Sequence, residues 1–126
     1  MSEKVWIGGI YLKEEGGYEI ILKSLTHYEK RLKTIHASPE VKEAAPMIET
    51  AKTDIEKFLV DSKIIEPLQQ DLEIIEKALE CRKSDIEKAE TTSDEYFLKL
   101  VENLDESKKD LPQIENALKK IKLYSE

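Results

Sequence analysis

Over residues 18–126 the chain contains no glycine, because all four of its glycines lie within the first 17 residues. Hairpin turns and phosphate-binding loops use glycine, since it adopts backbone conformations that other residues disfavour. A β-sandwich, a β-barrel or a doubly wound α/β fold is therefore excluded for most of the chain. The sequence predicts an all-α domain.

Apolar residues recur at alternating spacings of three and four, the periodicity of an amphipathic helix. The first series is Tyr18, Ile21, Leu25, Tyr28, Leu32 and Ile35. Ser38 and Pro39 then suit the N-cap and the first turn of a second helix. The second series is Val41, Ala44, Ile48, Ala51, Ile55 and Phe58. Pro46 falls on the outward side of that helix, where a kink is tolerated.

The pattern changes phase beside Pro67, because three residues rather than four follow Ile65 in the next series. This slip predicts that the second helix ends near residues 61–62. An unbroken helix over residues 39–90 would be about 78 Å long, so we favour the break. The third series is Ile65, Leu68, Leu72, Ile75, Leu79, Arg82, Ile86 and Ala89.

Thr92 and Glu95 form a capping box that predicts a further helix from about Ser93. Its series is Phe97, Leu100, Leu104, Ser107, Leu111, Ile114, Leu118 and Ile121. We expect one long helix, kinked near Pro112. The alternative is two helices, the second capped by Asp110 and Gln113.

Four amphipathic segments with short connections predict an antiparallel up-down helical bundle over residues 18–126, preceded by an irregular apolar arm over residues 1–17. The bundle should bury one wide apolar face of each helix. The side chains expected to be almost fully buried are Leu25, Leu32, Ile55, Leu72, Ile75, Leu100, Leu104 and Leu118.

The charges are numerous and mixed. The chain has 20 Lys and Arg against 27 Asp and Glu, a net charge of −7. No basic stripe is present, which argues against nucleic-acid binding, and no segment reaches the ~20 apolar residues that a membrane span requires. The single cysteine cannot form an internal disulfide, so we expect a reduced, cytoplasmic setting.

The histidines and the cysteine do not form a recognisable site. We expect structural or surface roles for His27 and His36, and a surface position for Cys81, which faces away from its apolar series and has no histidine nearby in sequence. No catalytic motif occurs, so we expect neither a catalytic residue nor a cofactor.

Two pairs of carboxylates form a pattern in the sequence that suggests a metal site. Glu73 and Glu76 are followed by Glu102 and Asp105, each pair at a helical spacing. This resembles the ExxE…ExxD arrangement of the MazG-type all-α nucleotide pyrophosphohydrolases. The resemblance implies that the four side chains hold Mg²⁺ against the phosphates of a nucleotide. The alternative is that they are solvated carboxylates on outer helix faces.

Arg82 is unusual because it occupies an apolar-series position. One interpretation is a buried charge that fixes helix register or binds an anionic ligand. The other, which we favour, is that its stem packs on the series while its guanidinium reaches solvent or a neighbouring glutamate.

The N-terminal arm concentrates large apolar residues, among them the single tryptophan. We expect it to dock onto its own bundle, onto a second copy or onto another protein, with Trp6, Ile7, Tyr11 and Leu12 as the interaction residues. By elimination, we expect a non-enzymatic protein that acts through protein–protein interaction, as a scaffold, adaptor or regulator. The alternatives are the Mg²⁺-dependent pyrophosphohydrolase and a small-ligand sensor with a cavity between its helices.

Overall fold

A computed structural model describes residues 10–34, 39–61, 63, 66–91, 95–101 and 103–124. Within these ranges the regular structure is entirely helical, which confirms the all-α class. The elements are a π-helical turn, η1 (Ile10–Glu14), and the α-helices α2 (Gly17–Thr34), α3 (Pro39–Val60), α4 (Glu66–Thr91), α5 (Glu95–Val101), α6 (Leu104–Lys109) and α7 (Leu111–Tyr124).

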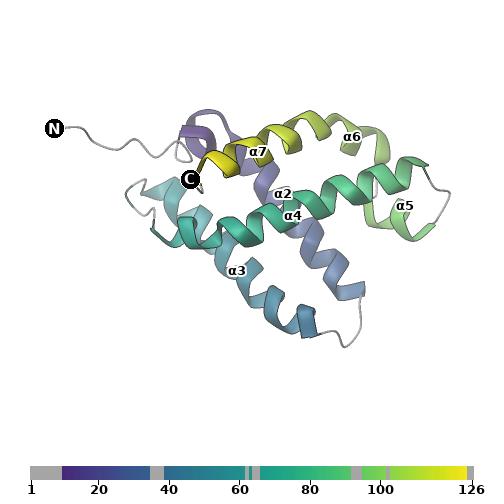
Figure 1. Ribbon diagram of the computed structural model, residues 1–126, viewed down its shortest axis with the longest axis horizontal. Helices are drawn as coiled ribbons and strands as arrows, with labels where there is room; N and C mark the ends of the chain where they lie inside the picture. Colours follow the sequence, from purple (N-terminus) through teal and green to yellow (C-terminus); the bar gives the residue numbers. More distant parts are fainter. Residues whose placement is uncertain are drawn as a thin grey trace.

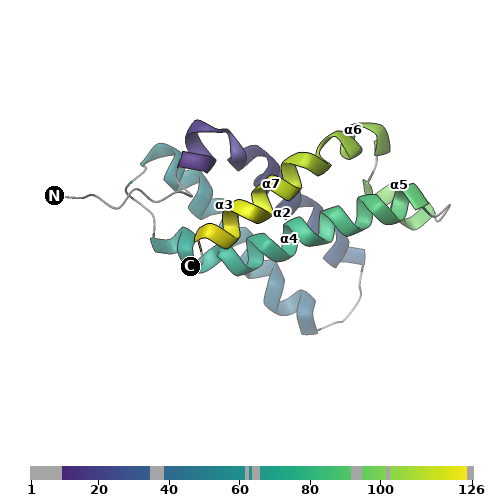
Figure 2. The same cartoon turned by 45° about the horizontal axis from the view of Figure 1, so that its top comes forward.

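The central element is α4, which packs against α2, α3, α5, α6 and α7. In Figures 1 and 2, α2 and α3 cross α4 obliquely, whereas α7 runs back along it in the opposite sense. The long helices therefore alternate in direction without sharing one common axis. Because α4 has neighbours on several sides, it buries more than a single narrow stripe.

The break predicted beside Pro67 is confirmed. The helix α3 ends at Val60, and the N–H of Asp61 closes its last turn with a 2.8 Å hydrogen bond to the Lys57 carbonyl. The next helix, α4, begins at Glu66. As expected, α3 runs through Pro46, which is exposed.

The expectation of one long C-terminal helix is wrong, because the segment forms three helices. Asn103 begins α6 as its N-cap, where its side chain accepts a 3.3 Å hydrogen bond from the Glu106 N–H. Asp110 ends α6, and its carbonyl accepts from the Ile114 N–H of α7 at 2.8 Å. The two-helix alternative placed a break near Asp110 but missed the one at Asn103. A side chain that satisfies a backbone N–H competes with continuation of the preceding helix.

Most of the expected core is buried. Of the predicted side chains, Leu25, Leu32, Ile55, Ile75 and Leu100 are at most 4% exposed. The prediction is wrong for three leucines that are only partly buried, namely Leu72, Leu104 and Leu118. On α4 the chain instead buries Ile74 and Ala78, because its neighbours cover the side of the helix beyond the predicted series.

The described part of the N-terminal arm packs on α2 as the turn η1. Gly16 links the two elements with a φ of +74°, a left-handed conformation that glycine adopts without strain. The next residue, Gly17, lies against the ring of Tyr11, and a Cβ at this position would stand no more than 2.7 Å from three ring atoms. The two glycines therefore let η1 fold back onto the bundle.

None of the helices in the described part of the chain combines the length and the apolar composition that a bilayer span requires.

Candidate functional site

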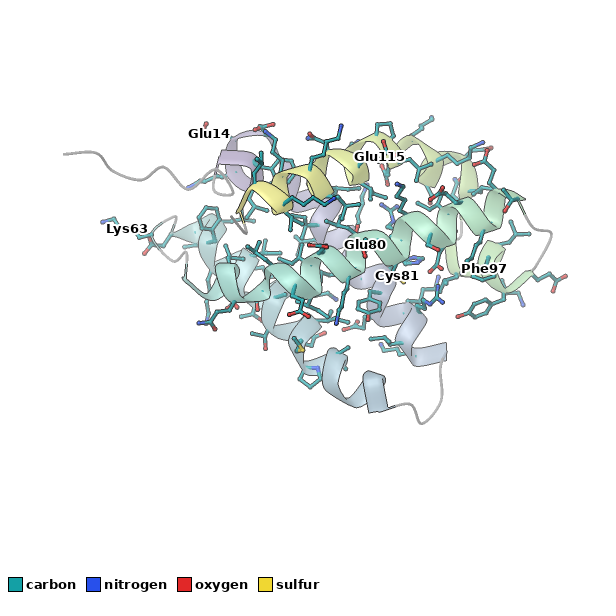
Figure 3. All side chains as sticks on the ribbon, viewed as in Figure 1. Glu14, Lys63, Glu80, Cys81, Phe97 and Glu115 are labelled. Atoms are coloured by element: carbon teal, nitrogen blue, oxygen red, sulfur yellow. The ribbon has the colours of Figure 1, made fainter. Side chains whose placement is uncertain are left out.

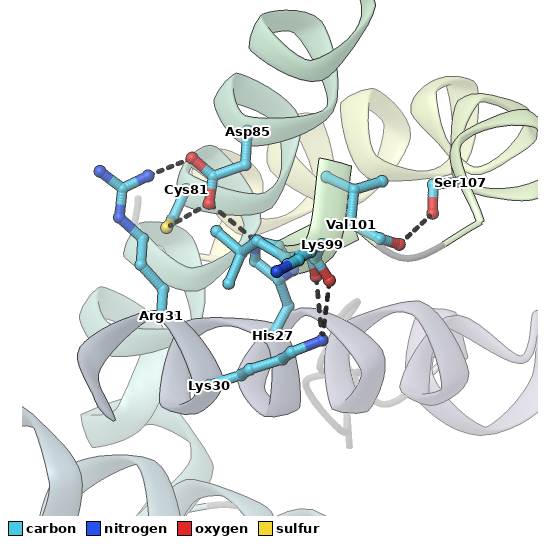
Figure 4. A network of polar contacts seen from close by, with 9 residues as sticks. His27, Lys30, Arg31, Cys81, Asp85, Lys99, Val101 and Ser107 are labelled. Carbon is cyan, nitrogen blue, oxygen red and sulfur yellow. Dashed lines mark hydrogen bonds and ion pairs between the residues drawn. The ribbon is translucent and has the colours of Figure 1, made fainter. Parts of the chain in front are cut away.

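A buried carboxylate joins α2 to α4. Asp85 of α4 is completely buried and faces Arg31 and His27 of α2 (Figure 4). Its Oδ1 accepts from Arg31 Nη1 in an ion pair, and its Oδ2 lies 2.7 Å from His27 Nε2. Because an ionised carboxylate only accepts hydrogen bonds, His27 donates through Nε2. A charge buried this deeply needs both a counter-ion and hydrogen bonds, and Asp85 has both.

Cys81 lies one turn before Asp85, with its Sγ 3.6 Å from the same Oδ2. Burial, and then the negative charge of Asp85, raises the pKa of the thiol to about 12. The thiol is therefore protonated at neutral pH and is a poor nucleophile. In a Cys-His-Asp triad the imidazole stands between thiol and carboxylate, whereas here His27 and Cys81 contact the same carboxylate oxygen.

The described residues contain one group close enough to share a metal ion. One ligand atom each from His27, Cys81 and Asp85 lie within 4.8 Å of one another. Coordination would require the thiolate, and the cation would lie beside the positively charged Arg31. Both conditions oppose a divalent cation. We interpret the group as a hydrogen-bonded network that fixes α2 on α4.

The expectations for His27 and Cys81 have different outcomes. His27 is buried, so of the two roles considered for it the structural one is observed. Cys81, expected at the surface without a histidine near it, is half-buried, and α2 brings His27 to its carboxylate partner. The reason is the oblique crossing of α2, which covers side chains outside its main apolar series. His36 lies outside the described residues.

Arg82 is also buried, with 9% of its surface exposed. Its Nη2 donates to Asp110 Oδ2 at 2.8 Å, and Lys23 Nζ lies 3.9 Å from the same oxygen. The expectation that its guanidinium reaches solvent or a glutamate is therefore wrong. The helices α6 and α7 fold back over α4, and the turn between them places Asp110 opposite Arg82.

The second terminal nitrogen of Arg82 is in a different situation. Nη1 is buried and has no hydrogen-bond partner among the described residues. A buried donor left unsatisfied destabilises a fold by about 1–3 kcal/mol. Arg82 therefore pairs with Asp110 through Nη2, while the N–H groups of its Nη1 stay unused.

Two adjoining clefts open beside Arg82, and both include Lys23, Arg82 and Val101 in their walls. The first, which we call the Lys30 cleft, has a volume of about 420 Å³ and lies between α2, α4 and α5. The second, the Asp110 cleft, has a volume of about 460 Å³ and extends along α6. Arg82 thus stands between two hollows on one side of the bundle.

Lys30 forms part of the first cleft in a fixed position. Its Nζ donates to the backbone carbonyls of Lys99 and Leu100 at 3.3 Å each, as Figure 4 shows. These carbonyls belong to the last turn of α5, where a cation is favourable against the helix dipole. On the neighbouring side, Ser107 donates to the Val101 carbonyl at 3.3 Å. Lys30 and Ser107 together hold the end of α5 between α2 and α6.

A buried pair of acidic side chains joins α3 to α4. Asp54 and Asp71 are 7% and 8% exposed. Burial, followed by the hydrogen bond and the charge of Asp54, raises the pKa of Asp71 to about 7. Two carboxyl groups this close share a proton at pH values where an isolated aspartate is ionised.

Sequence reasoning missed these buried acids, although one signal was available. Asp71, Ala78 and Asp85 recur at intervals of seven residues and so occupy one face of α4. The small Ala78 between the two acids, completely buried, indicates that neighbouring helices approach closely there.

The predicted interaction residues divide into two groups. Tyr11 and Leu12 are each 3% exposed and belong to the core, which corresponds to docking of the arm onto its own bundle. Trp6 and Ile7 lie outside the described residues, and their role stays a prediction.

Three of the four carboxylates of the pyrophosphohydrolase pattern lie within the described residues, and these three do not form a group that could share a metal ion. Glu73 is exposed and pairs with Lys77 on the same helix at 3.6 Å. Asp105 is exposed on α6, whereas Glu76 of α4 is half-buried. The only described group of metal-ligand side chains includes none of these three. Glu102 lies outside the described residues.

Comparisons of the chain with protein-family models, with curated proteins and with solved structures find no match.

Proposed function

We propose that this chain is a non-enzymatic helical-bundle protein that acts by binding another protein, and that α5 supplies the contact surface. The supporting observation is the exposure of two apolar side chains on either side of a half-buried third. Tyr96 and Leu98 are each 38% exposed, and the only residues that α5 buries are Leu100 and Val101. Phe97, between them, is half-buried.

The aromatic side chains of α5 are held in position. The rings of Tyr96 and Phe97 meet edge to face with centroids 5.0 Å apart, and Lys88 Nζ lies 5.4 Å from the Phe97 centroid. Figures 1 and 3 place α5 and Phe97 at the end of the molecule away from the last turn of α7. Aromatic side chains that are already ordered lose little entropy on binding, which is why they dominate interface energetics.

The partner we propose is a protein with a positively charged contact surface. The chain carries a net charge of −7, so two copies repel each other while a basic partner is attracted. We place this interaction in a reduced compartment such as the cytoplasm, where the single cysteine of the chain stays a thiol.

Site-specific photo-crosslinking in cells tests the proposal. A benzophenone amino acid at position 96 should capture one discrete protein, and the same group at Glu115, an exposed position on α7 whose side chain is 56% exposed, should not. The captured protein is then purified and its affinity for the chain is measured. The double variant Tyr96→Ala/Leu98→Ala should weaken that affinity at least about tenfold with the fold intact. Unchanged affinity would contradict the role of α5, and capture of a second copy would contradict the proposed partner.

Trp6 and Ile7 stay predicted contacts, and they can be separated from Tyr11 and Leu12 by truncation. A chain that lacks residues 1–9 retains the two buried side chains of η1. Weaker partner binding at an unchanged melting temperature would support an interaction role for Trp6 and Ile7. A large fall in the melting temperature would assign them to the core instead.

A further inference from the structure

The walls of the Lys30 cleft carry positive charge in a chain that is acidic overall. Its described lining includes no carboxylate and three cationic side chains, which are Lys23, Lys30 and Arg82. Asp110 compensates part of this charge, because it pairs with Arg82 and lies 3.9 Å from Lys23, but three cations against one carboxylate leave an excess of positive charge that an anion would neutralise. The lining therefore favours an anionic occupant.

Arg82 adds a donor that the fold leaves unused. Its Nη2 is taken by Asp110, while its buried Nη1 has no partner among the described residues. A guanidinium presents its N–H groups in a rigid fork that suits two oxyanions at once. Because the side chain is nine-tenths buried, its position is fixed before any ligand arrives. Arg82 also lines the cleft, so it contributes its charge and this unused donor to that side of the bundle.

The remaining walls indicate what kind of molecule carries the anionic group. Thr26 adds a hydroxyl group to the cleft, and Leu22, Leu100 and Val101 add apolar surface. The volume of about 420 Å³ is within the range of small-molecule sites. Such a cleft suits an organic molecule with an apolar body and a charged oxygen-rich head.

We propose that the Lys30 cleft binds a small organic molecule through a phosphate group, which Arg82, Lys23 and Lys30 contact while the apolar wall covers the rest of the ligand. A phosphate monoester carries more charge and more acceptor oxygens than a carboxylate, so it matches three convergent cations better. The cleft is lined by the buried Leu100 and Val101 of α5 and not by the exposed Tyr96 and Leu98, so this proposal does not depend on the proposed protein partner.

Titration of the ¹⁵N-labelled full chain tests the proposal. We use phenyl phosphate, inorganic phosphate and benzoate as probes and follow the backbone amides by NMR. Phenyl phosphate should cause saturable shifts at Lys23, Lys30, Arg82 and Val101. Its affinity should exceed that of inorganic phosphate, because only phenyl phosphate covers the apolar wall, and that of benzoate, which has a single negative charge.

Variants establish where the probe binds. Lys30→Gln and Lys23→Gln should each weaken phenyl phosphate binding about tenfold, the effect of losing one charge-assisted contact. The matched control is Lys33→Gln on the same helix, which makes the same charge change at a side chain that is 77% exposed. Arg82→Gln leaves Asp110 without its guanidinium partner, so it is interpreted only if its amide spectrum shows a folded chain.

Four results would overturn the proposal. Chemical-shift changes that do not saturate would mean an adventitious ion only. A loss of phenyl phosphate affinity in Lys33→Gln as large as that in Lys30→Gln would mean the same. Benzoate binding as tightly as phenyl phosphate would reject the phosphate group. Saturable binding whose shifts lie away from Arg82 and Lys30 would reject the cleft.

Discussion

The guanidinium of Arg31 on α2 is paired with the carboxylate of Asp85 on α4, and that carboxylate has no exposed surface. The two residues are 54 positions apart in the sequence. Because His27 and Cys81 contact the same carboxylate, one buried charge ties together several donors. The pair fixes both the register and the crossing of the two helices, since a shift of one turn would leave the charge unpaired.

Loss of this carboxylate should destabilise the protein strongly. We expect Asp85→Ala to lower the free energy of unfolding by about 3–5 kcal/mol, the usual effect of breaking a buried pair from one side. Urea denaturation measures it. The control Glu80→Ala, at an exposed position of the same helix, should change stability by less than about 0.5 kcal/mol. Equal effects of the two variants would show that the buried pair does not hold α2 on α4.

The Asp54–Asp71 pair should make stability depend on pH. Asp71 ionises near its ordinary pKa of 3.8 in the unfolded chain but keeps its proton up to about pH 7 in the folded protein. The folded state binds more protons between these values, so the free energy of unfolding falls as the pH rises through this window. The loss should be on the order of 1–3 kcal/mol.

Asp71→Asn should remove that dependence, because an amide does not titrate. Urea denaturation at pH 5 and pH 8 gives the free energy of unfolding at each pH. The difference between these two free energies should be smaller for the variant than for wild type. The variant should also be the more stable of the two at pH 8. Asp61→Asn, at an exposed aspartate just beyond α3, should retain the wild-type dependence. A variant that still loses as much stability as wild type would assign the titration to other groups.

Burial on α4 predicts which leucine matters most. Leu79 is completely buried, and Leu79→Ala should lower the free energy of unfolding by about 2–5 kcal/mol. Leu72 was expected to be almost fully buried but is only partly buried, so Leu72→Ala should lower the free energy of unfolding by about 1–2 kcal/mol. Chemical denaturation of both variants ranks them. The reverse order would mean that α4 is rotated relative to its neighbours.

The helices α2, α3 and α4 were predictable because each is a long periodic segment bounded by glycine or proline. The break at Asn103 was not, since it depends on one side chain that accepts from a backbone N–H while the apolar spacing continues past it. His27 lies outside the apolar series of α2. It is nevertheless buried, because α2 contacts α3, α4, α5 and α7.

The candidate site was less predictable than the fold. The partners of Arg82 and Asp85 come from other helices, and which side chains meet depends on how α2, α6 and α7 cross α4. Helical periodicity shows that Arg82 occupies an inward position, which was recognised. It carries no information about Asp110, because the position of that turn follows from the two breaks in the C-terminal segment.

The contact between Gly17 and Tyr11 gives the most direct test of how the N-terminal turn is attached. A methyl group at position 17 would overlap the Tyr11 ring, so Gly17→Ala should lower the free energy of unfolding by about 1–3 kcal/mol. In a Tyr11→Ala background the ring is absent, and most of that loss should disappear. A double-mutant cycle measured by thermal or urea unfolding gives the coupling energy, which we expect to exceed about 1 kcal/mol.

Gly16→Ala is the matched control. Its loss of stability comes from the positive φ of this position, because a Cβ there meets nothing within 4 Å. The Gly16→Ala loss should therefore be the same with or without the tyrosine. If Gly17→Ala is equally damaging in both backgrounds, η1 does not fold back onto α2 through Tyr11.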